Sequence, residues 1–451
     1  MLRRLPILLL ALALGACTAA STAQAPAPSP VPHAPAPPKN VILMIADGFG
    51  PASATLGAAA KGAPLAFDSL MVGAVETSAS DSRVTDSAAS ATAYACGIKT
   101  YNGAIGMTAD RQPCRTVLEL ASATGRATGL VATSRITHAT PASFGAHVER
   151  RAQEVEIARQ LAVSDVDLLV GGGRSYFTDD AAGAETGARL APLVDQMRDR
   201  GWAVATDRVG FDAITALPAA AFLADSHLAY EIDRDATDQP SLAEMTTRAL
   251  DLLAASPAGQ ERGFFVMIEG SRIDHAGHGN DPAAHLGDVL AYDAAVEAAL
   301  AWAAADGATL VVSTADHETG GMTLGRDGIY KWDPAPLLAA TASFEAMTAR
   351  LVDGGAPAAV VQEGLGLDAL PDGVEEAIRA AIASGDPYAL GPVIRDIASE
   401  PAGIGWTTGG HTAVDVGLYA WGPGAERFAG RMPNDAVGRA LMSLFREGTL
   451  R

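Results

Sequence analysis

Four carboxylates and three imidazoles stand in this sequence where apolar runs end or where glycine-rich loops begin. They are Asp47, Glu269, Asp274, His278, Asp316, His317 and His411. Asp274 and His278 lie four residues apart in IDHAGH, a spacing that lets both side chains reach one ion from a single helical turn. Each residue alone has an ordinary structural explanation as a turn, a helix cap or a backbone-bonded side chain. The whole set would be costly to bury without cations, so it predicts a centre for divalent metal ions.

The stretch VTDSAASA at residues 84–91 holds a further candidate, Ser87. Its ordinary explanation is helix capping, because Asp or Ser ahead of an alanine-rich run satisfies the first N–H groups of a helix. No Gly-x-Ser-x-Gly elbow surrounds Ser87, and the stretch supplies no histidine base. Metal coordination is then the natural way to turn its hydroxyl into a nucleophile. Capping and catalysis are compatible, since a helix start also favours an incoming phosphate.

The elements that must position these side chains follow from the hydrophobic pattern. Buried strands of a parallel sheet are predicted at 41–46, 129–133, 167–173, 264–270, 309–315 and 416–422. Helical patterns fill the gaps, for example at 152–162 and 290–305. This alternation predicts an α/β fold with a doubly wound, mostly parallel central sheet flanked by helices. Ligands bind such sheets at the carboxyl ends of the strands, which is where the carboxylates and imidazoles are expected.

Composition limits the classes of function. The chain has 451 residues, of which 49% are hydrophobic and 19% charged, so it can bury a large core, and one large domain over 39–451 is expected. Its formal net charge of −20 argues against nucleic acid as a partner. Phosphate chemistry is not excluded, because bound metal ions can reverse the local field.

The N-terminus has the pattern of an export signal. Residues 1–16 combine arginines, a short apolar stretch and small residues, and they are too short to span a membrane. The segment LGAC resembles a bacterial lipobox, which implies cleavage before Cys17 and its lipidation, with ordinary secretory cleavage as the alternative. A Pro/Ala-rich tether is predicted over 17–38. Export to the periplasm or outer membrane favours a disulfide between Cys96 and Cys114, with two buried thiols as the alternative.

The chain resembles the bacterial alkaline phosphatase family through a series of motifs in the family's order. They are ADGFG, TDSAASATA, THATPA, AHVERR, IEGSRIDHAGH, TADHETGG and TTGGHT. The stretches near 175–260 and 325–400 carry none of these motifs and are expected to be variable insertions or lid segments. The resemblance implies the alkaline phosphatase fold and hydrolysis of small phosphate monoesters through a phosphoserine. Family members are often dimers, but no interface can be identified from this sequence.

The resemblance also implies roles for individual residues. It implies one zinc site of Asp47, Asp316 and His317, a second of Asp274, His278 and His411, and a magnesium site of Asp47, Thr140 and Glu269. Ser87 is similar to the phosphorylated nucleophile, and Arg151 to the arginine that holds two phosphate oxygens, a task that suits a guanidinium fork.

Two histidines depart from the enterobacterial form of the family. His138 and His275 stand where that form has Asp and Lys, which leaves the two Zn²⁺ sites intact but leaves open which ion, Mg²⁺ or another, the third site holds. The remaining candidates His147, His227 and His285 match no ligand position and are expected to be structural.

Other functions fit the sequence less well. A sulfatase needs Cys or Ser in a C/S-x-P-x-R context, whereas Ser87 is followed by AAS. Phosphomutases act on cytosolic sugar phosphates, which conflicts with export, and a phosphodiesterase remains the nearest enzymatic rival. A zinc-scavenging lipoprotein without catalysis would need neither Ser87 nor Arg151.

Overall fold

The computed structural model describes residues 37–178, 192–384 and 389–446. The predicted export signal, Cys17 and nearly all of the tether lie outside these described residues.

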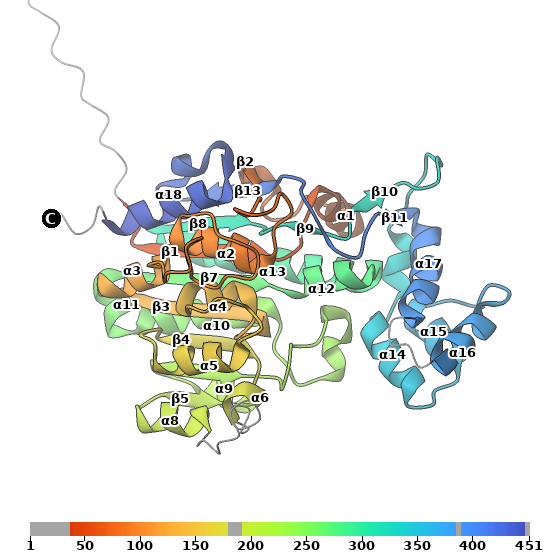
Figure 1. Ribbon diagram of the computed structural model, residues 1–451, viewed down its shortest axis with the longest axis horizontal. Coiled ribbons are helices and arrows are strands. Elements are labelled where there is room, and N and C mark those ends of the chain that lie inside the picture. The colour runs from red at the N-terminus through yellow and green to blue at the C-terminus, as the bar shows by residue number, and fades with distance from the viewer. Residues whose placement is uncertain (1–36, 179–191, 385–388, 447–451) are drawn as a thin grey trace, which may run out of the picture. The chain divides into compact units, whose positions relative to one another are not determined.

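A single large sheet organises the described chain (Figure 1). Its strands, in spatial order, are β14 (Gly430–Pro433), β2 (Met71–Glu76), β13 (Val416–Trp421), β8 (Thr309–Thr314), β1 (Asn40–Ala46), β7 (Phe264–Gly270), β3 (Ala127–Arg135), β4 (Leu168–Gly172), β6 (Ala219–Phe222) and β5 (Ala203–Ala205). β13 runs antiparallel to both of its neighbours, and the other pairings are parallel. The mostly parallel sheet expected from the sequence is confirmed, and each predicted strand overlaps an observed one. The prediction was wrong in one respect, because the strand expected to be parallel at 416–422 is β13, which is antiparallel.

Helices cover both faces of this sheet. One group comprises α2 (Ser87–Cys96), α3 (Val117–Ala123), α4 (Ala139–Gly145), α5 (Glu154–Val163) and α18 (Asn434–Arg446). The other comprises α1 (Pro51–Lys61), α10 (Leu242–Ala255), α12 (Arg272–Gly279) and α13 (Pro282–Asp306). Shorter helices are α6 (Ser175–Thr178), α8 (Leu193–Asp199), α9 (Arg208–Ala213) and α11 (Pro257–Arg262), with 3-10 turns at Asp68–Leu70, Glu231–Ala236, Ala335–Ala339 and Ala425–Phe428.

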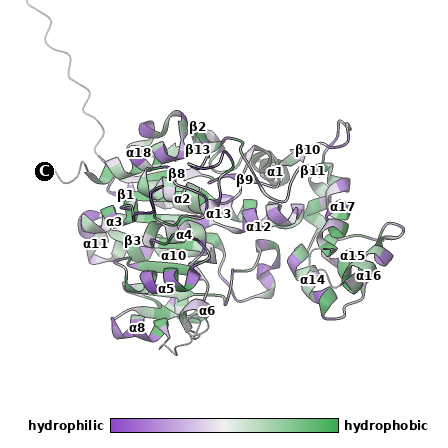
Figure 2. Ribbon diagram, viewed as in Figure 1, coloured by the Kyte–Doolittle hydropathy of each residue, from purple (hydrophilic) through white to green (hydrophobic). Residues whose placement is uncertain are grey.

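The central strands form the core because their sequences are apolar on both faces. Every residue of β1, β7 and β8 is buried, as expected for parallel strands covered by helices on both sides. Figure 2 shows these strands as hydrophobic, while outer helices such as α5 also carry hydrophilic faces. A disulfide joins Cys96, at the end of α2, to Cys114. None of the described helices combines the length and apolar character that crossing a membrane requires.

The two stretches without motifs differ in structure. The 175–260 stretch supplies β5, β6 and α10, so part of it belongs to the main sheet and its helical cover. The 325–400 stretch lies between β10 (Met322–Leu324) and β11 (Ile404–Trp406) and contains α14 (Phe344–Val352), α15 (Pro357–Leu365), α16 (Val374–Ser384) and α17 (Leu390–Ala402). These four helices share a small hydrophobic core of their own.

Candidate active site

The carboxyl ends of three neighbouring strands bring the predicted acidic residues together. Strands β8, β1 and β7 are adjacent in the sheet. Asp47 directly follows β1, Glu269 is the penultimate residue of β7, and Asp316 lies two residues beyond β8. All three side chains are fully buried. Parallel pairing therefore explains how residues far apart in sequence come to share one site.

Gly48 lets helix α12 approach this edge. It has a φ of +77°, and a Cβ there would lie 2.6 Å from the Cα of Asp274. Any side chain at this position would push α12, and with it Asp274, away from Asp47. The first glycine of the ADGFG motif, Gly48, is thus explained by the close approach of the Asp274 backbone.

Ser87 is the first residue of α2, but Asp86 performs the capping. The Asp86 carboxylate accepts a hydrogen bond from the Ala89 N–H at 2.9 Å. The Ser87 hydroxyl is instead buried and lies 3.2 Å from Nε2 of His317. Because Asp86 caps the helix, the Ser87 hydroxyl remains available for chemistry.

The first candidate metal group surrounds that hydroxyl. Asp47, Asp316 and His317 present ligand atoms within 4.8 Å of one another. The His317 Nε2 lies 3.2 Å from Asp316 Oδ2 and 3.5 Å from Asp47 Oδ1. Neither oxygen of Asp47 has a hydrogen-bond partner among the described residues. Buried acceptors without donors are expensive, and a cation would satisfy them.

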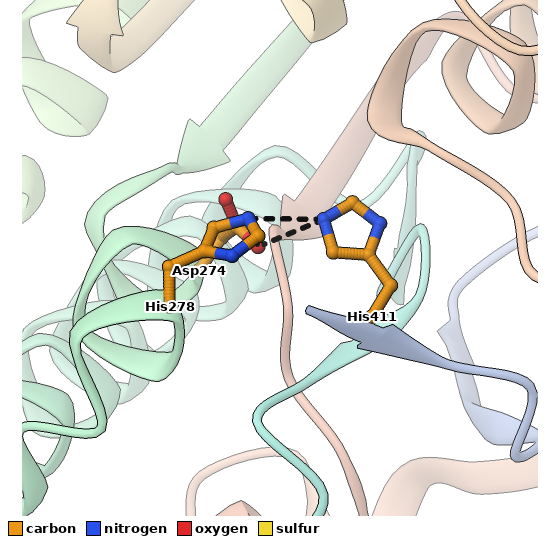
Figure 3. Close-up of side chains that lie close together, drawn as sticks. All are labelled: Asp274, His278 and His411. Carbon is orange, nitrogen blue, oxygen red and sulfur yellow. Dashed lines mark hydrogen bonds and ion pairs between the residues drawn. The ribbon is translucent and has the colours of Figure 1, made fainter. Parts of the chain in front are cut away.

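The second group, drawn in Figure 3, consists of Asp274, His278 and His411. Nδ1 of His278 lies 2.7 Å from the Gly409 carbonyl, and Nδ1 of His411 lies 2.8 Å from that of Thr85. Carbonyls only accept, so each Nδ1 carries the proton and each Nε2 carries a lone pair. The two Nε2 atoms face each other at 3.1 Å, and both approach Asp274 Oδ1 at 3.4 and 3.5 Å. Three acceptors directed at one point fit a metal ion.

The third group contains Asp47, Glu269 and His138. Thr140 Oγ1 and Glu269 Oε1 have no hydrogen-bond partner in the described part of the chain. His138 lies with its Nε2 2.9 Å from Nη2 of Arg151, which can only donate. In its neutral form His138 then carries its proton on Nδ1, an atom without a hydrogen-bond partner among the described residues. In this arrangement His138 is a donor beside the third site rather than a ligand in it.

Burial and like charges disfavour the ionised forms of Asp47 and Glu269 when no metal is bound. Burial, followed by repulsion from Asp316, raises the pKa of Asp47 well above its ordinary value. Burial also raises the pKa of Glu269 to about 7. Burial lowers the pKa of His411 to about 4, and the neighbouring His317 adds to this shift. Divalent cations would favour the ionised form of both carboxylates, and the lowered pKa already keeps His411 in the neutral form that binds metal.

Arg151 is held beside Ser87 by its neighbours. Its Nη1 donates to Asp86 Oδ2 at 3.2 Å, and its backbone N–H donates to the Gly103 carbonyl at 2.8 Å. The Gly103 N–H in turn donates to the Asp86 carboxylate. The guanidinium is therefore fixed relative to the first turn of α2, and its side chain is 30% exposed.

The remaining histidines divide into two kinds. His147 contacts Glu119 and the Gly106 carbonyl, and His285 contacts Ser53, which agrees with structural roles. His227 differs, because its ring packs 4.4 Å from that of His275 and 5.5 Å from that of His138.

Sequence reasoning missed the proximity of His227 to the site. It follows β6, whose residues are AAAF, and alanine is a weak strand signal. The contact between Asp86 and Arg151 was not predicted either, because the sequence indicated only a helix cap at this position.

The fold and the site together define a metal-dependent hydrolytic enzyme built on a mostly parallel sheet between helices. The chain belongs to the alkaline phosphatase family, whose sequence model matches residues 38–446. It is an enzyme that hydrolyses phosphate monoesters. The family, fold and activity expected from the motifs are confirmed.

Individual relatives agree with this assignment. The repressible alkaline phosphatase of Saccharomyces cerevisiae is 40% identical, over 89% of this chain and 80% of that protein. Alkaline phosphatase 3 of Bacillus subtilis is 37% identical, over 89% of this chain and 87% of that protein. The crystal structure of a cold-active alkaline phosphatase from Shewanella sp. matches with a TM-score of 0.82 and 34% identity, over 90% of this chain and 99% of that one.

Proposed function

We propose that this phosphatase works through a phosphoserine at Ser87. The observation that carries the proposal is the buried Ser87 hydroxyl, 3.2 Å from a histidine of one candidate metal group and at the N-terminus of α2. In the first step, Ser87 Oγ forms a bond to phosphorus, the bond to the ester oxygen breaks, and the alcohol leaves with a proton. In the second step, water attacks the phosphoserine, which releases inorganic phosphate and restores the hydroxyl.

The residues of this chain would divide the work as follows. Arg151 would hold two phosphate oxygens while Asp86 fixes its guanidinium, and the N–H groups of the first turn of α2 would favour the incoming anion. Two Zn²⁺ would be held by the groups centred on His317 and on Asp274, and Mg²⁺ by Asp47, Thr140 and Glu269. When bound, these ions would favour deprotonation of the nucleophile and neutralise charge on the departing oxygen.

The identity of the third ion depends on the residues near it. The alkaline phosphatase of the Antarctic bacterium TAB5, 30% identical to this chain, binds magnesium in its M3 site in variants in which one histidine is replaced by glutamate or aspartate. This supports the proposal that a histidine, here His138, affects which ion the third site holds. We further propose that the protein is exported, is lipidated at Cys17 and forms a dimer.

The test combines metal analysis with turnover of p-nitrophenyl phosphate. Ser87→Ala should keep the zinc content of the wild type and lose turnover, whereas Ser122→Ala, on α3, should keep both. Mass spectrometry of acid-quenched wild type should find a phosphoryl group on the peptide that contains Ser87. A fully active Ser87→Ala variant would refute the proposal, and faster turnover of the methyl diester than of the monoester would favour a phosphodiesterase.

A further inference from the structure

Thr319 touches both candidate zinc groups without belonging to either. It lies in the two-residue strand β9 (Glu318–Thr319), which pairs with β12 (His411–Thr412). Its hydroxyl donates to Asp274 Oδ1 at 2.5 Å and lies 3.2 Å from Nδ1 of His317. Asp274 belongs to one metal group and His317 to the other.

The proton count fixes the direction of this chain of hydrogen bonds. A hydroxyl has one proton to donate, and an ionised carboxylate can only accept. Thr319 therefore donates its hydroxyl proton to Asp274. Its oxygen must then accept from His317, which places the imidazole proton on Nδ1. The lone pair of His317 is thereby left on Nε2, the atom that faces Ser87 and the first metal group.

Among the described residues, the hydroxyl of Thr319 is the hydrogen-bond partner of His317 Nδ1. Thr319 is fully buried, and the backbones of Gly48 and Gly277 close on it, since a Cβ on either glycine would lie 3.0 Å from a Thr319 side-chain atom. Without the hydroxyl, the His317 N–H would face an apolar surface, a loss that buried polar groups tolerate poorly.

Thr319 also lies next to His411, which belongs to the second metal group. In the β9–β12 ladder it stands directly opposite His411, and its own N–H donates to the Gly48 carbonyl at 3.1 Å. One residue thus contacts Asp274, follows His317 by two positions and pairs with His411.

We propose that Thr319 is a positioning residue that orients a ligand of each of the two zinc sites through one hydroxyl. This inference rests on the proposed metal sites. Partners that orient metal ligands are worth about 10- to 100-fold in metal affinity. Loss of the Thr319 hydroxyl should therefore weaken both sites, although Thr319 itself binds neither ion.

The experiment compares Thr319→Val, which keeps the shape and loses the hydroxyl, with Thr319→Ser, which keeps the hydroxyl and loses the methyl group. Thr246→Val serves as the control, because Thr246 is buried in α10 and its hydroxyl has no partner in the described structure. Zinc affinity is measured by chelator competition with bound zinc per chain as the readout. Each substitution is also made in His411→Ala and in Asp316→Ala backgrounds, so that the two sites are measured separately.

We expect Thr319→Val to weaken both sites by about 10- to 100-fold, and Thr319→Ser and Thr246→Val to match their parents. Wild-type affinity in Thr319→Val, a loss at one site alone, or an equal loss in Thr319→Ser would overturn the inference. If Thr319→Val does not fold, Thr319→Ala is judged by the same criteria. Failure of the wild type to bind zinc would refute the metal sites themselves, a result distinct from any of these.

Discussion

Replacement of Arg151 tests the phosphate-binding part of the site. Its guanidinium is fixed by Asp86 and by the contact with His138, and its backbone N–H donates to Gly103, so the side chain is preorganised before substrate arrives. Arg151→Ala removes this donor. Arg151→Lys keeps the charge but loses the planar fork, and Arg150→Ala, at the exposed neighbouring position, is the matched control.

The size of the expected loss in kcat/KM follows from how far the Arg151 side chain is buried. Removal of a preorganised donor from a site that excludes water costs about 3 to 4 kcal/mol in the transition state. The Arg151 side chain is 30% exposed, and solvent screening reduces this to roughly 2 to 3 kcal/mol. That range corresponds to a loss of about 30- to 150-fold in kcat/KM. Arg151→Lys should lie between Arg151→Ala and the wild type.

The assay measures kcat/KM for p-nitrophenyl phosphate and the inhibition constant of inorganic phosphate, with bound metal recorded for each variant. Product phosphate presents the same oxygens as the substrate, so its inhibition should weaken along with kcat/KM. Metal content should not change, because Arg151 binds no ion. Kinetic constants for Arg151→Ala that match those for Arg150→Ala would refute the reasoning.

Three further outcomes are expected at the metal groups. Asp316→Ala or His411→Ala should each remove nearly all activity together with one zinc per chain, because each site offers only three protein ligands; normal zinc content and turnover would contradict the assignment. His138→Asp should tighten magnesium binding in a titration of zinc-loaded enzyme, since a carboxylate can accept from both Arg151 and metal-bound water; identical midpoints would count against it. In the metal-free protein the pKa of Glu269 is raised from 4.5 to about 7, so the folded state holds a proton that the unfolded chain releases, and stability falls as pH rises through this window. Chelator-treated Glu269→Gln should show a smaller decline when thermal unfolding is compared at about pH 5 and about pH 8, since the raised pKa of Asp47 still contributes, and an unchanged pH dependence would show that Glu269 is not a source of it.

The sheet was predictable because its central strands consist of strongly apolar residues. β1, β7 and β8 are buried on both faces and match runs of Val, Ile, Leu and Phe. The edge strand β5 and its neighbour β6 are short and rich in alanine, a residue that favours helices and is depleted in strands. Their place in the sheet comes from tertiary packing, which local sequence does not encode.

The metal-ligand residues were predictable from the sequence, whereas the residues that position them were not. Carboxylates and imidazoles at strand ends are chemically distinctive, so Asp47, Glu269 and Asp316 could be selected by type and position. Thr319 and Asp86 are ordinary residue types whose importance depends on which atom they meet in the folded chain. A weak signal for Thr319 was present, since it lies two positions after His317 in an extended segment and therefore on the same side.

The metal groups also explain why this edge of the sheet carries unpaired acceptors inside a stable fold. Asp47 and Glu269 are fully buried, and several of their oxygens have no donor among the described residues, a combination that opposes folding of the metal-free chain. Cations that bind only the folded state would reverse the sign of this contribution, because their binding free energy adds to folding stability. Hydrogen bonds to those oxygens would have made the metal-free protein more stable, but they would have occupied the lone pairs that the ions require. The arrangement therefore couples stability to metal occupancy, and we expect the zinc-loaded enzyme to unfold at a higher temperature than the chelator-treated one.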